Sequence, residues 1–227
     1  MKIKSDKPVT ACLRCGTCCE KGGPSFHIED KHLIDKGNIP ARFIYTIRKG
    51  EPSYDNIRRA LLPVTSDVIK IKGRDNTWCC TFYDKQENAC QIYANRPIEC
   101  RTLKCWDTRA IEDIYEKNRL TRKDLLSEVD GLWDLVEAHE KRCSYETIGQ
   151  LVSELKRTRS NAVAGQIIEM VEYDKQLRTL VVQNGRLDAE NLEFLFGRPL
   201  GQTIRAFGLE IEIIDGKITL VSSAKKG

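Results

Sequence analysis

The sequence contains no long apolar run. No segment approaches the roughly 20 consecutive apolar residues that a helix needs to cross a membrane. The opening residues, Met1 to Pro8, are polar and charged and lack the apolar stretch of a signal peptide. These absences argue against a membrane protein or an exported one, and they predict a cytoplasmic location.

Histidine is scarce, and several catalytic motifs are missing. The 227 residues include three histidines, and the chain has no glycine-rich phosphate-binding loop, no G-x-S-x-G elbow and no C-x3-C-x2-C spacing of the radical S-adenosylmethionine enzymes. The net charge of +4 comes from 37 basic and 33 acidic residues mixed along the chain. Such a weak excess does not argue for nucleic-acid binding, which needs clustered charge.

Cysteine, in contrast, is abundant and unevenly distributed. Nine of the ten cysteines lie within the first 105 residues, and four of them fall in the stretch CLRCGTCC at residues 12–19. The cytoplasm keeps thiols reduced, so we interpret these cysteines as metal ligands rather than as disulfides. Metal or iron–sulfur chemistry is therefore the main functional signal of the sequence.

Cys12, Cys15 and Cys18 follow a C-x2-C-x2-C spacing. Two residues between cysteines allow a tight turn to direct both sulfurs at one metal, and Gly16 eases that turn. The same spacing fits three corners of an iron–sulfur cubane, whereas zinc is often held by two separated cysteine pairs. Because adjacent residues rarely reach one small ion together, Cys18 and Cys19 are expected to serve different metals, or one of them to stay outside the coordination shell.

A second group of cysteines follows about sixty residues later. Nine residues separate Cys80 from Cys90 and Cys90 from Cys100, and four separate Cys100 from Cys105. Together the two groups supply enough thiols for one cubane plus other ligands, or for two four-coordinate sites. Neighbouring cations are expected to offset the thiolate charge and to lower the thiol pKa values. These cations are Arg14, Arg96, Arg101 and Lys104.

Short motifs accompany the cysteines in both groups. In chain order they are CLRCGTCC at residues 12–19, Cys80-Thr81-Phe82, Cys90-Gln91-Ile92-Tyr93, Arg96-Pro97, Cys100-Arg101 and Cys105-Trp106. Together they resemble the CxxCxxCC family of cysteine-cluster proteins over residues 10–106. The resemblance implies zinc or iron chelation and assigns no reaction. Flagellin lysine methylases are similar in their cysteine cluster, which implies that such a cluster can accompany methyl transfer.

The resemblance implies a metal-binding role for eight cysteines. They are Cys12, Cys15, Cys18, Cys19, Cys80, Cys90, Cys100 and Cys105. The additional thiol of Cys79 leaves open whether Cys79 or Cys80 is the ligand. Arg96-Pro97 is expected to position the turn that carries Cys100, with Arg96 donating a hydrogen bond to a ligand.

Three further residues receive separate predictions. Cys143 lies outside the resemblance and is expected to be a packing residue. His27 is expected in the core or on the surface, with completion of a metal site as the alternative. His139 is expected on the surface.

The residue pattern predicts an α+β fold in two parts. Residues 1–107 are expected to form an irregular, cysteine-rich metal-binding domain with short strands. Residues 108–227 are expected to form a helical region that ends in a β-hairpin, packed with the first part as one unit. Strands or extended pieces are expected at residues 43–47, 68–71, 78–83 and 90–93, with a helix at 28–35 and another from residue 97 that carries Cys100 and Cys105.

Helical spacing of apolar residues dominates the second part. A capping box at Thr121–Asp124 precedes an apolar stripe that runs to Val136, and further stripes cover residues 148–155 and 163–181, the last closed by Asn184-Gly185. Alternating residues at 209–213 and 217–221, around Asp215-Gly216, predict the hairpin. Residues 50–63 are mixed, since Pro52 and Pro63 act as breakers.

The sequence therefore favours a metal-binding cysteine-cluster protein that holds iron or zinc through thiolates, with protein partners left open. Iron, as a 4Fe–4S cluster, is slightly preferred because of the cubane-like spacing. One alternative is an iron–sulfur-dependent enzyme such as a protein lysine methyltransferase. Another is a zinc-stabilised interaction module.

Overall fold

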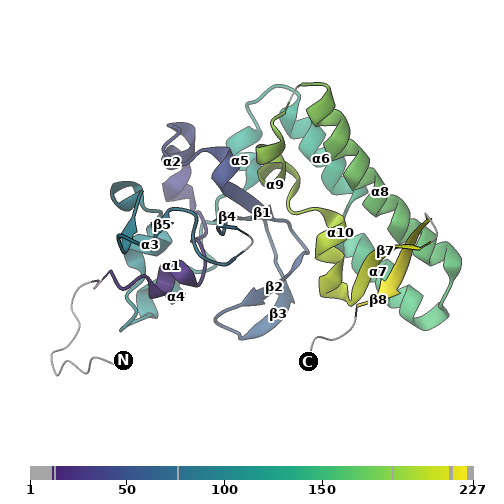
Figure 1. Ribbon diagram of the computed structural model, residues 1–227, viewed down its shortest axis with the longest axis horizontal. Coiled ribbons are helices and arrows are strands. Elements are labelled where there is room, and N and C mark those ends of the chain that lie inside the picture. Colours follow the sequence, from purple (N-terminus) through teal and green to yellow (C-terminus); the bar gives the residue numbers. More distant parts are fainter. Residues whose placement is uncertain (1–11, 13, 76, 186, 215–216, 224–227) are drawn as a thin grey trace. The chain divides into compact units, whose positions relative to one another are not determined.

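The computed structural model describes residues 12, 14–75, 77–185, 187–214 and 217–223 (Figure 1). Contacts group the chain into two units. The first unit consists of Met1–Ile39 and Lys70–Arg119, and the second unit of Pro40–Ile69 and Leu120–Gly227. The chain thus leaves the first unit, returns to it and ends in the second. The domain division at residue 107 stays a prediction.

The first unit is built from short elements joined by turns. They are α1 (Thr17–Glu20), η1 (Ile28–Asp30), α2 (Lys31–Asp35), β5 (Tyr83–Asp84), β6 (Ala89–Cys90), η3 (Tyr93–Asn95), α3 (Ile98–Thr102) and α4 (Arg109–Ile114). Strands β5 and β6 are antiparallel. Phe26, Leu33, Ile71 and Phe82 are buried beneath the turns, so a small apolar core supports a backbone with little regular structure.

The second unit contains the long helices. Its elements are η2 (Ala41–Phe43), β1 (Ile44–Ile47), β2 (Pro52–Asp55), β3 (Ala60–Pro63), α5 (Arg122–Leu126), α6 (Leu132–Arg142), α7 (Tyr145–Thr158), α8 (Asn161–Gln183), η4 (Ala189–Asn191), α9 (Leu192–Phe196), α10 (Leu200–Thr203), η5 (Ile204–Phe207), β7 (Leu209–Ile214) and β8 (Lys217–Ser222). Strand β4 (Val68–Ile71) pairs with β1 and continues into the first unit.

Local signals in the sequence set several helix ends of the second unit. Thr121 and Asp124 form the expected capping box at the start of α5. The Ser144 hydroxyl accepts a hydrogen bond from the Thr147 N–H and caps α7. Helix α8 ends at Asn184, and Gly185 follows with a positive φ of 66°. Helices α7 and α8 share an apolar core that includes Ile148, Val152, Ile167, Leu200 and Ile204.

The predicted C-terminal hairpin is present. Strands β7 and β8 are antiparallel, with Leu209 opposite Ser222 and Ile213 opposite Ile218. Its predicted turn, Asp215-Gly216, lies outside the described residues. Helices with short antiparallel strands make the fold α+β, as predicted.

Several local predictions are wrong. The extended piece expected at residues 90–93 stops at Cys90, where β6 ends, and a 3₁₀ helix begins at Tyr93. Residues 78–83 form turns, and only Tyr83 joins a strand, because the backbone here bends to pair Gly73 with Cys80. The stripe from Leu125 to Val136 is interrupted at residues 127–131, where Gly131 has a positive φ of 67°. The hairpin β2–β3 was not expected, yet Pro52 and Pro63 face each other at its open end, where a missing N–H is tolerated.

A buried carboxylate connects four helices of the second unit. Asp174 on α8 accepts hydrogen bonds from His139 Nε2 on α6 at 2.7 Å, from Arg178 Nε at 2.9 Å and from the Leu200 N–H of α10 at 2.9 Å. Arg178 also donates to the carbonyl oxygens of Phe196 and Gly197, at the end of α9. His139 is fully buried, so its predicted surface position is wrong: the hydrogen bond to Asp174 compensates its burial.

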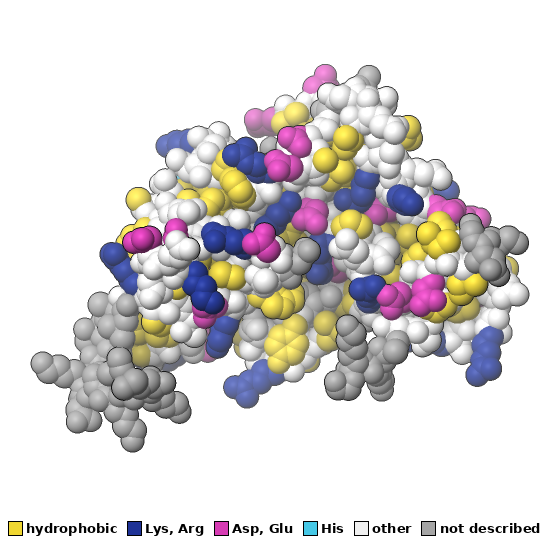
Figure 2. All heavy atoms as spheres, viewed as in Figure 1, with side chains coloured by type: hydrophobic (Ala, Val, Ile, Leu, Met, Phe, Trp, Pro, Cys, Tyr) yellow, Lys and Arg dark blue, Asp and Glu magenta, His cyan; other side chains and the backbone are white. Residues whose placement is uncertain are grey.

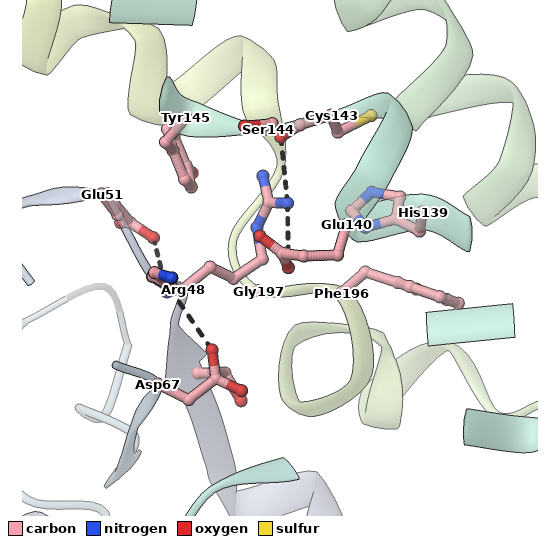
Figure 3. Close-up of polar contacts among 12 residues, drawn as sticks. Arg48, Glu51, Asp67, His139, Glu140, Cys143, Ser144, Tyr145, Phe196 and Gly197 are labelled. Carbon is pink, nitrogen blue, oxygen red and sulfur yellow. Dashed lines mark hydrogen bonds and ion pairs between the residues drawn. The ribbon is translucent and has the colours of Figure 1, made fainter. Parts of the chain in front are cut away.

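A second set of buried charges surrounds Arg48 (Figure 3). Arg48 has no exposed surface, its Nη1 donates to the Cys143 carbonyl oxygen at 3.1 Å, and its guanidinium lies 4.4 Å from the Tyr145 ring centre. Arg122 donates to both carboxylate oxygens of Asp67, at 2.7 and 3.0 Å, and to Glu140 at 2.8 Å. These contacts tie the start of the second unit to its helices.

The surface charge is mixed, as the sequence indicates. Figure 2 shows basic and acidic side chains interspersed over the visible face. None of the helices in the described part of the chain has the length and apolar character that crossing a membrane requires.

We predict that Asp174→Asn destabilises the second unit by about 3–5 kcal/mol, because it leaves Arg178 buried without its counter-ion. Denaturant unfolding followed by helix circular dichroism measures this loss. The matched control is Asp134→Asn on α6, where the aspartate is exposed, and this variant should unfold like the wild type. Equal stability of the two variants would contradict the role given to Asp174.

Candidate metal centre

The first cysteine group lies on a turn that leads into α1. Gly16 precedes the helix with a positive φ of 75°, a conformation that favours glycine. A Cβ atom at Gly16 would overlap the Tyr83 hydroxyl, so the turn packs directly against β5. Cys15 and Cys18 are exposed, and Cys19 is half-buried.

Backbone hydrogen bonds join the second cysteine group to the first. The Cys80 N–H donates to the Cys19 carbonyl oxygen at 2.8 Å, and the Arg74 N–H donates to the Cys79 carbonyl oxygen at 2.7 Å. Cys80 is buried, whereas Cys79 is half-buried. Cys90 follows in β6, directly opposite Tyr83 of β5. Strand β5 therefore contacts the turn at Gly16 through Tyr83 and pairs with the strand that carries Cys90.

Helix α3 carries Cys100, and a buried aspartate holds the helix in place. Pro97 precedes the helix, where its missing N–H costs nothing. The Ile98 N–H donates to Asp30 Oδ1 at 2.8 Å, while Asp30 Oδ2 accepts from the His27 N–H at 3.1 Å. Asp30 thus fixes the first turn of α3, two residues from the Cys100 thiol.

Glu99, beside Cys100, anchors the same helix. Its carboxylate accepts hydrogen bonds from the Ser25 N–H at 2.7 Å and from Arg119 Nη1 at 2.8 Å, and it lies 3.3 Å from His27 Nε2. Burial opposes ionisation of Glu99, yet His27, Lys70 and Arg119 together hold its pKa at about 2. Sequence analysis missed both Asp30 and Glu99, since their partners are remote in the sequence.

His27 belongs to this buried network. Its Nδ1 lies 2.7 Å from the Lys117 carbonyl oxygen and its Nε2 faces Glu99. Both ring nitrogens are therefore engaged, and His27 is a core residue in this structure. His32 is exposed, with Nδ1 at 2.8 Å from the Glu29 carbonyl oxygen.

Electrostatic coupling shows which thiols lie close together. The Cys19 thiol interacts with those of Cys18, Cys80 and Cys100, and the Cys100 thiol also interacts with Cys90. Five of the eight predicted ligands, from four separate chain segments, therefore lie within electrostatic range of one another. Cys15 couples to Cys18 and lies at the edge of this group. Cys80 is among the thiols that act on Cys19 and on Cys100, and the choice between Cys79 and Cys80 as the ligand stays open.

The gathered thiols titrate unusually. The side chains of Cys18 and Cys19 act on each other, which lowers the pKa of the Cys18 thiol to about 6 and raises the pKa of the Cys19 thiol. The pair therefore releases one proton readily and the second with difficulty. Burial raises the pKa of Cys80 and of Cys100, and neighbouring thiolates raise them further. A cation at this place would relieve the repulsion and replace the protons.

Cationic side chains also approach the thiols. Arg96 contributes to the low pKa of Cys18, and Arg74 acts in the same direction on Cys80. Lys70 interacts with Cys80 and Cys100, and burial lowers the pKa of its amine. Of the cations expected from the sequence, Arg101 instead lies 3.7 Å from Asp30.

Two predicted ligands lie apart from these couplings. Cys12 is exposed, and its sulfur accepts a hydrogen bond from the Arg14 N–H at 3.4 Å. Cys105 is exposed in the turn between Lys104 and Asp107, beyond the end of α3. The prediction that the same helix carries Cys100 and Cys105 is therefore wrong for Cys105. Metal binding by Cys12 and Cys105 stays a prediction, as it does for the other six cysteines.

Among the described residues, a compact group of three metal-capable side chains is found in the second unit, and no three cysteine sulfurs of the first unit come as close to one another. In the described residues, the ligand atoms of His139, Cys143 and Asp174 lie within 4.8 Å of one another. Asp174 is already saturated by three donors, and the Cys143 thiol faces the Met170 carbonyl oxygen at 3.7 Å. Burial raises the pKa of Cys143 to about 12. This group therefore serves packing, which agrees with the expectation for Cys143.

The donor set of the first unit fits a metal that prefers sulfur. Thiolates are the ligands of zinc and of iron–sulfur clusters, and the five gathered thiols, with arginines close by, offer the charge that either would need. The region therefore has the character of a thiolate chelating domain.

Comparison with protein families agrees with this class. Residues 11–122 match the family model described as "CxxCxxCC: Putative zinc- or iron-chelating domain". Residues 11–122 therefore form a CxxCxxCC domain, as the resemblance implied. No curated protein and no solved structure matches the chain.

We predict that Gly16→Ala disrupts the cysteine turn and lowers metal content, because the new methyl group meets Tyr83 and α1 must shift. Metal analysis of the purified variant measures the effect. Gly37→Ala is the matched control, since Gly37 has a similar φ of 71° with nothing within 4 Å of an added Cβ. Equal metal content in the two variants would show that the contact with Tyr83 does not shape the centre.

Proposed function

We propose that the cysteine group of the first unit holds a metal through its thiolates, with iron in an iron–sulfur cluster as the first choice and zinc as the alternative. The observations that carry this proposal are the backbone hydrogen bond that joins Cys80 to Cys19 and the electrostatic influence of the Cys18, Cys19, Cys80, Cys90 and Cys100 thiols on one another. Four thiolates suffice for a zinc ion or a 4Fe–4S cluster, and the group offers more than that number. The reduced state that these thiols require is consistent with a cytoplasmic location.

The donor chemistry narrows the choice of metal. His27 is the histidine nearest in sequence to the first cysteine group, and both of its ring nitrogens are engaged. We therefore expect the ligands of the site to be sulfur atoms alone. Such sites select zinc or iron–sulfur clusters rather than hard cations. The C-x2-C-x2-C spacing favours iron. The metal, once bound, supplies the positive charge that holds the thiolates together, or a redox couple if it is iron.

Metal analysis of protein purified without oxygen tests the proposal. We expect iron with acid-labile sulfide and a broad absorbance band near ~400 nm, as thiolate-held clusters give. Stoichiometric zinc in colourless protein would establish the alternative. Protein that takes up neither iron nor zinc would refute the proposal.

Cysteine variants then test the ligands. Cys15→Ser and Cys18→Ser should lose metal and destabilise the first unit, because metal binding is coupled to folding in such sites. The control is Cys143→Ala, whose thiol lies in the apolar core of the second unit, and it should keep full metal content. Full metal content in Cys15→Ser would remove Cys15 from the ligand set.

A further inference from the structure

Two arginines lie over one aromatic ring beside the cysteine group. The guanidinium carbon of Arg96 is 3.6 Å from the centre of the Tyr93 ring, and that of Arg14 is 4.6 Å from it. Arg96 is held further by its Nε, which donates to the Tyr93 carbonyl oxygen at 2.9 Å. Two positively charged side chains therefore contact a single ring, although their like charges repel each other.

Neither arginine has a carboxylate partner in the part of the chain that the structure describes. Among the described residues, no Asp or Glu oxygen lies within ion-pair distance of Arg14 or Arg96. Other exposed arginines of the first unit do have such partners: Arg101 faces Asp30, and Arg109 donates to both oxygens of Asp107. The first unit also carries the net charge of the chain, with 17 basic and 13 acidic residues against 20 of each in the second unit.

The cysteine centre accounts for only one of these charges. Arg96 is half-buried and acts on the Cys18 thiol, so the centre itself serves as its partner. Arg14 is exposed, and its place between Cys12 and Cys15 is set by a backbone with a positive φ of 52°. The Tyr93 ring, 39% exposed, holds the Arg14 guanidinium at the surface. Cation–π contact orders the fork and leaves its donors open.

We propose that Arg14 and Arg96 bind an oxyanion, a carboxylate or a phosphate group, next to the metal centre. A guanidinium presents paired N–H groups that match both oxygens of such an anion. An anion held by both forks would offset their mutual repulsion. This inference rests on the proposed function, because it places the anion beside a centre that holds a metal; its chemistry suits an anionic ligand or metal chelate that approaches the exposed thiols.

Calorimetric titration of the metal-loaded protein tests this inference. The probes are succinate and inorganic phosphate, at constant ionic strength maintained with chloride. Saturable binding of one probe is expected, and the tighter probe identifies the anion class. Arg14→Gln should weaken binding by roughly tenfold or more, as loss of a charge-assisted hydrogen bond does. Arg14→Lys keeps the positive charge but not the paired N–H groups, so its affinity for the anion should lie between those of the wild type and Arg14→Gln.

The matched control is Arg109→Gln, an exposed arginine of the same unit that is already paired with Asp107, and it should bind like the wild type. Absence of saturable binding, or equal weakening in Arg14→Gln and Arg109→Gln, would overturn the inference. Metal content is measured for each protein before titration. Metal-loaded protein that binds neither probe would refute the oxyanion site alone. Wild-type protein that takes up neither iron nor zinc would refute the proposed function.

Discussion

Bringing several ionisable sulfurs into one place is the constraint on which the first unit depends. Each thiolate raises the cost of ionising the next, and burial of Cys80 and Cys100 adds to that cost. Without a cation the Cys19, Cys80 and Cys100 thiols keep their protons, because burial and neighbouring thiols raise their pKa values. The same repulsion makes the group a strong site for a metal, since a cation that replaces the protons removes the penalty.

The polar network beneath the thiols explains how so irregular a unit positions them. Asp30 and Glu99 accept backbone and side-chain donors from three other segments, so α3 is fixed although it has only five residues. A helix of this length has no stability of its own. Buried carboxylates thus supplement the small apolar core of the first unit, and Asp174 plays a comparable part among the longer helices of the second unit.

Local chemistry could be predicted from the sequence, and remote pairing could not. The cysteine spacing, the capping box at Thr121–Asp124 and the helix end at Asn184 are each decided within a few residues. The partners of Asp30 and Glu99 lie about seventy residues away, and His139 meets Asp174 thirty-five residues later. The β-forming residues at 78–83 form turns because backbone contacts to Gly73 and Cys19 override their propensity.

The exposure of the thiols decreases from Cys15 and Cys18 to Cys80. Cys15 and Cys18 face solvent, Cys19 and Cys90 are half-buried, and Cys80 is buried. A purely structural metal site is normally closed by its four ligands, whereas here the cubane-like CxxCxxC segment forms the outer side. A metal or cluster would therefore contact the inner thiols through fixed backbone and the outer thiols through a turn that depends on Gly16.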